Sequence, residues 1–410
     1  MRHEHPINRM HPRMLAGLAA LALTLLAACD GQDPSDNQEQ LEELALLDHE
    51  GSALDPDGVG GFGREAEATD EPAGAPADAD LMLHAPLDPS LSTTHQAGWA
   101  WVTSSGSLGA SDVHTGTISS SKLGTGRYLV DITPSPYMNV QVVAYGTSNA
   151  ACKRVGGAGG TGPQISCFDP DGAYVDSAFV VTFQSLSGTS IYQTGAYLSS
   201  PASGAATYSW NSTGGVNTVT WNASAQAYDV TLPGMNFGNA SVHVTANGYV
   251  GDSCRANYWG WGTARVKCFD SDGNATQSQF ALTYMEDTML LGNAGGHTWI
   301  SSGTASSSYS KSFPRYSCDS PGTFSTASVG LDINVSLSDT GWPPASWAEY
   351  VPMVSDYGST DRNCKIVNWS APGTGYRARV RCFDGDGTQI DANNTPFTLS
   401  FSTDYPPAPC

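Results

Sequence analysis

Short runs of residues that alternate between apolar and polar or are β-branched occur between residues 93 and 404. Clear examples are the segments 128–132, 140–145, 228–232, 242–246 and 377–383. In the last of these, a period of two places Ala378, Val380 and Cys382 on one face of a strand. Gly, Ser, Asn and Pro separate the runs, and no amphipathic stretch in this region has the length of a helix. The pattern predicts an all-β region.

One pattern of residues occurs three times in this region. Each copy has a glycine, a cysteine six residues later, then Cys-Phe-Asp-x-Asp-Gly, then two aromatic residues. The anchor residues are Gly146, Cys152, Cys167 and Gly172; Gly248, Cys254, Cys268 and Gly273; and Gly358, Cys364, Cys382 and Gly387. Constant offsets around loops of variable length predict a shared fold. We therefore expect three tandem small antiparallel β-sandwich-like repeats, at 93–187, 188–288 and 289–410.

A leader precedes the repeats. Arg2, Arg9 and Arg13 come before an apolar run from Met14 to Ala28, which is the pattern of an export signal. Leu26-Ala27-Ala28-Cys29 resembles the lipobox of bacterial lipoproteins. The resemblance implies a signal peptide at 1–28, cleavage before Cys29 and fatty acids such as palmitate on that residue. We expect a protein anchored by lipid to a membrane of the cell envelope, and the sequence does not assign the leaflet.

The segment 29–92 differs in composition from the repeats. Residues 30–90 hold 17 acidic side chains and one basic side chain, Arg64. Such a segment cannot bury enough apolar surface to offset chain entropy, so we expect a disordered acidic tether. Its charge also argues against nucleic-acid partners, which bind basic surfaces.

The nine cysteines divide by position. We expect one disulfide in each repeat, because disulfides persist in an exported protein. The pairs are Cys152–Cys167, Cys254–Cys268 and Cys364–Cys382. Cys318 and Cys410 are then left to pair, which would pin the C-terminal tail to the third repeat. Cys29 is left unpaired, in agreement with lipid modification.

The Asp-x-Asp-Gly segments and two tryptophan pairs are candidate binding sites. The paired aspartates are Asp169 and Asp171, Asp270 and Asp272, and Asp384 and Asp386. They predict either tight hairpin turns or Ca²⁺ ligands, since Ca²⁺ prefers oxygen donors; no other cofactor is expected. Trp99 with Trp101 and Trp259 with Trp261 predict either core packing or a surface that stacks on sugars.

No catalytic motif occurs, and His243 and His297 fall at different places in their repeats. The repeats resemble a unit of uncharacterised secreted bacterial proteins, with Cys364-Lys-Ile-Val-Asn-Trp369 as the best match, and the resemblance implies no activity. We expect a non-catalytic lipoprotein for adhesion, envelope interaction or binding of a protein or glycan ligand. A carbohydrate-binding protein using the paired tryptophans is the alternative, and a cell-surface hydrolase is a weaker one.

Overall fold

The computed structural model describes twelve segments within residues 96–402. The segments are 96–113, 116–133, 139–156, 162–185, 195–235, 240–286, 290–291, 295–301, 304–311, 323–338, 350–371 and 375–402. All belong to one compact unit, residues 69–410. The predicted signal peptide, Cys29, the predicted acidic tether, Cys318 and Cys410 lie outside the described residues.

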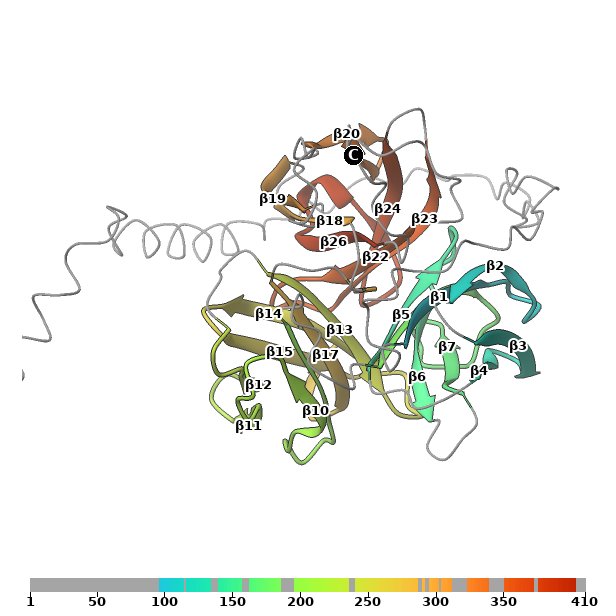
Figure 1. The fold of residues 1–410 in the computed structure, drawn as a ribbon. Helices are drawn as coiled ribbons and strands as arrows, with labels where there is room; N and C mark the ends of the chain where they lie inside the picture. The colour runs from blue at the N-terminus through green and yellow to red at the C-terminus, as the bar shows by residue number, and fades with distance from the viewer. Residues whose placement is uncertain are drawn as a thin grey trace, which may run out of the picture. The chain divides into compact units, whose positions relative to one another are not determined.

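The described residues form strands, turns and one short 3₁₀ helix, which confirms the predicted all-β class (Figure 1). In this part of the chain no helix has the length and apolarity needed to cross a membrane. The segments 128–132 and 377–382 bury every second side chain, as their pattern predicts, whereas 140–145 and 242–246 are buried on both faces of their strands.

Repeat 1 contains eight strands. They are β1 (Gln96–Val102), β2 (Leu108–Val113), β3 (Thr117–Gly124), β4 (Arg127–Thr133), β5 (Asn139–Tyr145), β6 (Ala151–Gly156), β7 (Gln164–Phe168) and β8 (Ala178–Ser185). Hydrogen bonding arranges them in two antiparallel groups, β2-β1-β8-β5 and β3-β4-β7-β6. We call these the first and second sheets of the repeat.

Repeat 2 has the same plan. Its strands are β9 (Gly195–Ser200), β10 (Thr207–Asn211), β11 (Thr218–Asn222), β12 (Ala227–Thr231), β13 (Ser241–Asn247), β14 (Ser253–Gly260), β15 (Thr263–Phe269), β16 (Ala275–Thr276) and β17 (Gln279–Met285). The first sheet is β10-β9-β17-β13, and the second is β11-β12-β15-β14 with β16 beside β15.

Repeat 3 completes the series. Its elements are β18 (Gly295–Ser301), β19 (Thr304–Lys311), β20 (Thr323–Val329), β21 (Asp332–Ser338), β22 (Val351–Asp356), β23 (Arg362–Ser370), β24 (Tyr376–Asp384), β25 (Gln389–Ile390), the 3₁₀ helix η2 (Ala392–Asn394) and β26 (Phe397–Ser402). The first sheet is β19-β18-β26-β22, and the second is β20-β21-β24-β23 with β25 beside β24.

The three repeats are joined to one another by β-bridges. A single parallel bridge joins each first sheet to the second sheet of another repeat, at the last residue of β5 or β13 or at the residue that follows β22. The bridges are Tyr145 with Ile366, Asn247 with Arg154, and Tyr357 with Ala256. Repeat 1 is thus joined to repeat 3, repeat 2 to repeat 1 and repeat 3 to repeat 2, so the connections form a closed ring.

The apolar cores also connect the repeats. One core draws residues from both repeat 1 and repeat 3, including Trp99, Trp101, Val335 and Val380. The interiors of repeats 1 and 2 form two further clusters. Burial of apolar surface is the main stabilising term in such cores. Because a core crosses the joint between repeats, the repeats are parts of one folded body.

Candidate functional site

Backbone hydrogen bonds close each joint between repeats. The glycine that follows each first-sheet edge strand donates its N–H to a carbonyl in the second sheet of the neighbouring repeat. The three bonds are Gly146 to Ile366 (2.9 Å), Gly248 to Arg154 (3.0 Å) and Gly358 to Ala256 (3.0 Å). These glycines have φ between 100° and 125°, a conformation that favours glycine. Their recurrence in the sequence therefore has a structural reason.

A buried cation supports each joint from the position after the first cysteine of the repeat. Each donates to the loop between the edge strand and the first cysteine of another repeat. The donors and acceptors are Lys153 Nζ to the backbone oxygen of Asp252 (3.1 Å), Arg255 Nη1 to that of Thr360 (2.6 Å), and Lys365 Nζ to that of Ser148 (2.7 Å). Cations, loops and glycines therefore follow one cyclic order.

Lys153 and Arg255 also have carboxylate partners. Lys153 forms an ion pair with Asp252, and Arg255 Nη2 lies 2.7 Å from Asp361 Oδ1. Burial lowers the pKa of Lys153 to about 7. Burial also raises the pKa of Asp361, against the opposing effect of Arg255. A buried charge is stable only when it is paired and hydrogen-bonded, so these side chains depend on their partners in the neighbouring repeat.

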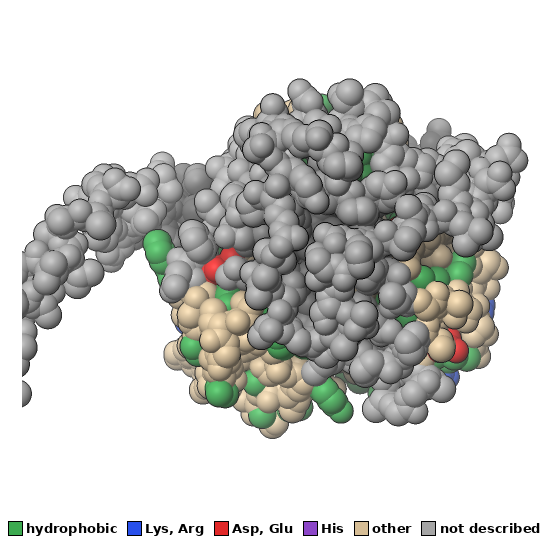
Figure 2. Space-filling view, viewed as in Figure 1, with side chains coloured by type: hydrophobic (Ala, Val, Ile, Leu, Met, Phe, Trp, Pro, Cys, Tyr) green, Lys and Arg blue, Asp and Glu red, His purple; other side chains and the backbone are tan. Residues whose placement is uncertain are grey.

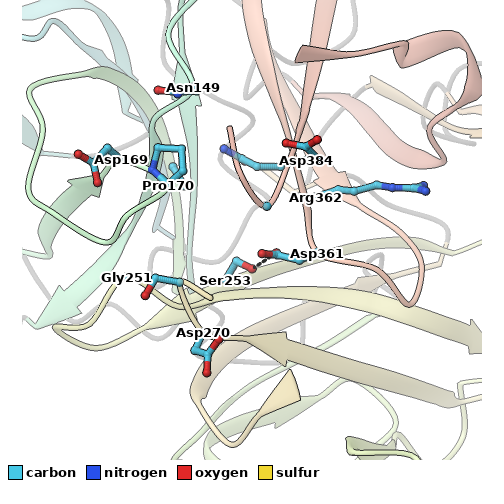
Figure 3. Close-up of a pocket in the computed structure, with 13 residues that line it drawn as sticks. Asn149, Asp169, Pro170, Gly251, Ser253, Asp270, Asp361, Arg362 and Asp384 are labelled. Carbon is cyan, nitrogen blue, oxygen red and sulfur yellow. Dashed lines mark hydrogen bonds between the residues drawn. The ribbon is translucent and has the colours of Figure 1, made fainter. Parts of the chain in front are cut away.

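The loops that receive the cations meet around a small cavity of about 40 Å³ (Figure 3). All three repeats line it, through Asn149, Gly251, Asp361 and the first aspartate of each Asp-x-Asp-Gly segment. A cavity of this size holds about two or three waters, whereas sites for drug-sized ligands have volumes of about 300–1,000 Å³. The cavity has room for solvent and no room for an enclosed substrate.

The Asp-x-Asp-Gly segments form tight turns at this cavity. In each, Oδ1 of the first aspartate accepts a backbone N–H four residues later, at 2.8 Å in every repeat. The pairs are Asp169 with Ala173, Asp270 with Asn274, and Asp384 with Thr388. The closing glycines Gly172, Gly273 and Gly387 have φ of 78°, 74° and 77°. These are the features of the hairpin-turn alternative.

The same aspartates do not gather into a cation-binding group. The second aspartates Asp171, Asp272 and Asp386 are exposed, and the carboxylates of Asp169 and Asp270 point away from each other (Figure 3). Among the described residues no group of three or more His, Cys, Asp or Glu side chains has an arrangement that could hold a metal ion.

The structure pairs six cysteines as the repeat pattern predicts. The disulfides are Cys152–Cys167, Cys254–Cys268 and Cys364–Cys382. Each joins two directly opposite residues of neighbouring strands in a second sheet. Each therefore links the strand that carries a joint cation to the strand that leads into an Asp-x-Asp-Gly turn.

The first tryptophan pair lies inside the joint between repeats 1 and 3. Trp99 is fully buried and Trp101 nearly so. Trp369 packs edge-on against both indoles, at 6.1 Å from Trp99 and 6.2 Å from Trp101, and against Tyr145 at 5.2 Å. Burial removes Trp99 and Trp101 from the candidate ligand-binding residues, because a side chain from a different repeat covers the strand face they share.

The second pair divides between core and surface. Trp259 packs edge-on against Tyr357 at 4.9 Å and Trp299 at 6.4 Å, across the joint between repeats 2 and 3. Trp261, two residues later, is 73% exposed. The two indoles therefore do not form one surface, and only Trp261 is available to a ligand.

The weaker hydrolase hypothesis needs a serine and a histidine that a substrate can reach. His243 Nε2 lies 2.9 Å from Ser400 Oγ and 3.1 Å from Ser241 Oγ. All three residues are buried, and burial lowers the pKa of His243 to about 3, with a smaller effect from His297. The histidine is enclosed between repeats 2 and 3, where it serves packing and hydrogen bonding.

The joint cations are the group of residues that sequence reasoning missed. Lys153, Arg255 and Lys365 each follow the first cysteine of a repeat directly. A basic residue at one position of three copies, in a region with few charges, was the signal for a shared buried contact. The chain was also compared with protein-family models, curated sequences and solved structures, and no match was found.

Proposed function

We propose that this protein is a lipid-anchored lipoprotein of the cell envelope that presents a rigid three-repeat β head to an extracellular ligand, without catalysis. The anchor is Cys29, and the acidic segment 29–92 is the spacer between the membrane and the head. The observation that carries the proposal is the use of the buried cations. Lys153, Arg255 and Lys365 all hold one repeat to another, so the head is built for a fixed shape.

The surface of the head supports binding. On the face of the molecule drawn in Figure 2, the described residues include few acidic or basic side chains. Three disulfides and three bridged joints link the strands that carry the described Asp-x-Asp-Gly turns. Rigid scaffolds that present surface loops are a common arrangement for recognition, because little entropy is lost on binding.

Membrane fractionation tests the anchor. Full-length protein should sediment with membranes and incorporate radiolabelled palmitate, whereas the Cys29→Ser variant should appear in the soluble fraction without label. A Cys318→Ser variant is the control, since it removes a cysteine that lies outside the lipobox. If Cys29→Ser stays with the membranes, the proposed anchor is wrong. Turnover of chromogenic esters or glycosides by the purified wild type, lost on His243→Gln, would contradict the non-catalytic part.

A further inference from the structure

A hairpin of repeat 2 ends on a tryptophan in an unfavourable backbone conformation. Trp261 and Gly262 are the two turn residues between β14 and β15, with φ of 51° and 70°. Two-residue turns with positive φ at both positions strongly favour Asn-Gly, Asp-Gly or Gly-Gly. A bulky side chain with positive φ is a rare outlier, and such strain collects at functional sites.

The surroundings hold this strained turn in place. The Gly262 carbonyl accepts the backbone N–H of Leu232 at 2.7 Å, and Thr263 Oγ1 donates to the Gly260 carbonyl at 2.7 Å. A Cβ added to Gly262 would lie 2.4 Å from the carbonyl oxygen of Met235. The end of the hairpin is therefore packed against the chain below it, and the direction of the Trp261 side chain is set by a fixed backbone.

A second exposed aromatic side chain accompanies Trp261. Tyr258 is 40% exposed, and its hydroxyl lies 3.7 Å from the position that a Cβ on Gly260 would occupy. The tyrosine ring therefore extends over Gly260 toward the turn. Two aromatic side chains are thus presented at one end of the hairpin.

Polar groups in fixed positions continue from the tyrosine across the second sheet. Tyr258 is directly opposite Arg265, which is directly opposite Asp229. Arg265 Nε lies 2.7 Å from Asp229 Oδ1, and Asn222 Nδ2 donates to Asp229 Oδ2 at 2.8 Å. Arg265 and Asp229 are partly exposed and their charges cancel. The row offers both donors and acceptors to a ligand without favouring either charge.

We propose that the hairpin end formed by Trp261 and Tyr258 binds pyranose rings of an extracellular polysaccharide, with hydroxyl groups of the sugar bonded to Arg265, Asp229 and Asn222. The C–H face of a pyranose carries partial positive charge and fits the negative π face of an aromatic ring. Trp and Tyr provide this contact area at a low entropic cost. An anionic membrane surface would instead favour a cluster of Lys and Arg.

This inference rests on the proposed function and names the ligand class of the head. The test is affinity electrophoresis of the full-length protein in gels that contain cellulose derivatives, soluble chitosan, mannan or starch. Trp261→Asn is the decisive variant, because Asn suits this turn position. We expect wild type to be retarded by at least one polymer, and Trp261→Asn to bind at least tenfold more weakly with a melting temperature equal to or above that of wild type.

Gln226→Asn is the matched control. Gln226 is also an exposed residue of repeat 2 with positive φ (47°), and its replacement relieves the same strain without removing an aromatic ring. This variant should bind like wild type. Failure of every polymer to retard wild type, or unchanged binding by Trp261→Asn, would overturn the inference.

Membrane insertion is the other outcome that would overturn it. In a Cys29→Ser background, Trp261-dependent binding to phosphatidylcholine–phosphatidylglycerol vesicles would show that the hairpin end contacts lipid. The fractionation of Cys29→Ser itself is a separate measurement, so failure of the sugar site and failure of the anchor can be told apart.

Discussion

The ion pair between Arg255 and Asp361 allows a quantitative test of how the repeats are joined. The guanidinium is 1% exposed and the carboxylate 16% exposed, and their closest N–O distance is 2.7 Å. Asp361→Ala removes the hydrogen-bonded carboxylate and leaves the buried guanidinium with the Thr360 carbonyl and the Ser253 hydroxyl as acceptors and Asp356 as a nearby acidic group. Breaking a buried pair in this way costs about 3–5 kcal/mol, of which we expect the lower end because Asp361 reaches solvent.

Urea unfolding with the disulfides intact, followed by circular dichroism, measures this cost. The control is Asp229→Ala, which breaks an Arg–Asp pair of the same 2.7 Å distance whose side chains are 37% and 43% exposed, and which should cost about 0–1 kcal/mol. Arg255→Met combined with Asp361→Ala should cost less than Asp361→Ala alone, because the buried guanidinium that has lost its hydrogen-bonded carboxylate is then absent. Equal losses for the two single aspartate variants would refute the assigned role of the joint cation.

His243, two glycines and the Asp-x-Asp-Gly turns allow three further tests. His243→Gln places in repeat 2 the residue found at the equivalent Gln141 of repeat 1. The pKa of His243 is about 3 in the folded protein and about 6.5 in the unfolded chain, so wild type should lose up to about 1.4 kcal/mol of stability per pH unit as the pH falls from 6.5 to 3. The variant should lose less over this range, and urea midpoints measure the difference. Gly387→Ala should cost about 2 kcal/mol or more, because φ is 77° and the added Cβ would meet Pro170 at 2.3 Å, whereas Gly330→Ala, with φ of 62° and open space, should cost only about 1 kcal/mol. Chelation with EDTA should leave the thermal midpoint unchanged, because the first aspartate of each Asp-x-Asp-Gly turn already accepts a backbone N–H. A fall of several degrees would instead support the hypothesis that these aspartates bind Ca²⁺.

The sequence predicts the strands and the disulfides because both depend on local spacing. A period of two fixes which side chains share a face, as in 377–383, and that choice does not depend on distant residues. The disulfides follow because every copy has one cysteine six residues after its glycine and one directly before Phe-Asp-x-Asp-Gly, and the two lie at directly opposite positions of neighbouring strands. Repetition turns three weak local signals into one strong signal.

The joints between repeats could not be predicted in the same way. Alternation places Trp99 and Trp101 on one face of a strand, yet it does not say what covers that face. Trp369, which covers both, comes from a different repeat. A pattern read along the chain likewise cannot separate Trp259 from Trp261, because the turn that exposes the latter depends on contacts with Leu232 and Met235.

The joints are similar in their backbone and differ in what fills them. Trp101 and Tyr145 meet Trp369 at one joint, and Trp299 and Tyr357 meet Trp259 at the next. Strand registers place Ser199 and Asn247 at the equivalent positions of the joint between repeats 1 and 2.

Polar contacts between first sheets occur at that third joint and again at the joint between repeats 2 and 3, where Ser355 Oγ accepts the backbone N–H of Val244 at 3.1 Å. Buried Thr245 Oγ1 donates to Gln141 Oε1 at 2.7 Å and accepts the backbone N–H of Val142 at 3.1 Å. Lys153 and Asp252 form an ion pair at the same joint. Hydrogen bonds are directional whereas apolar contacts are not, so the polar contacts that these two joints share fix the register between their repeats, and indole packing adds burial at one of them. A ring needs its three joints to close together, so two joints with a fixed register limit how the remaining joint can pack.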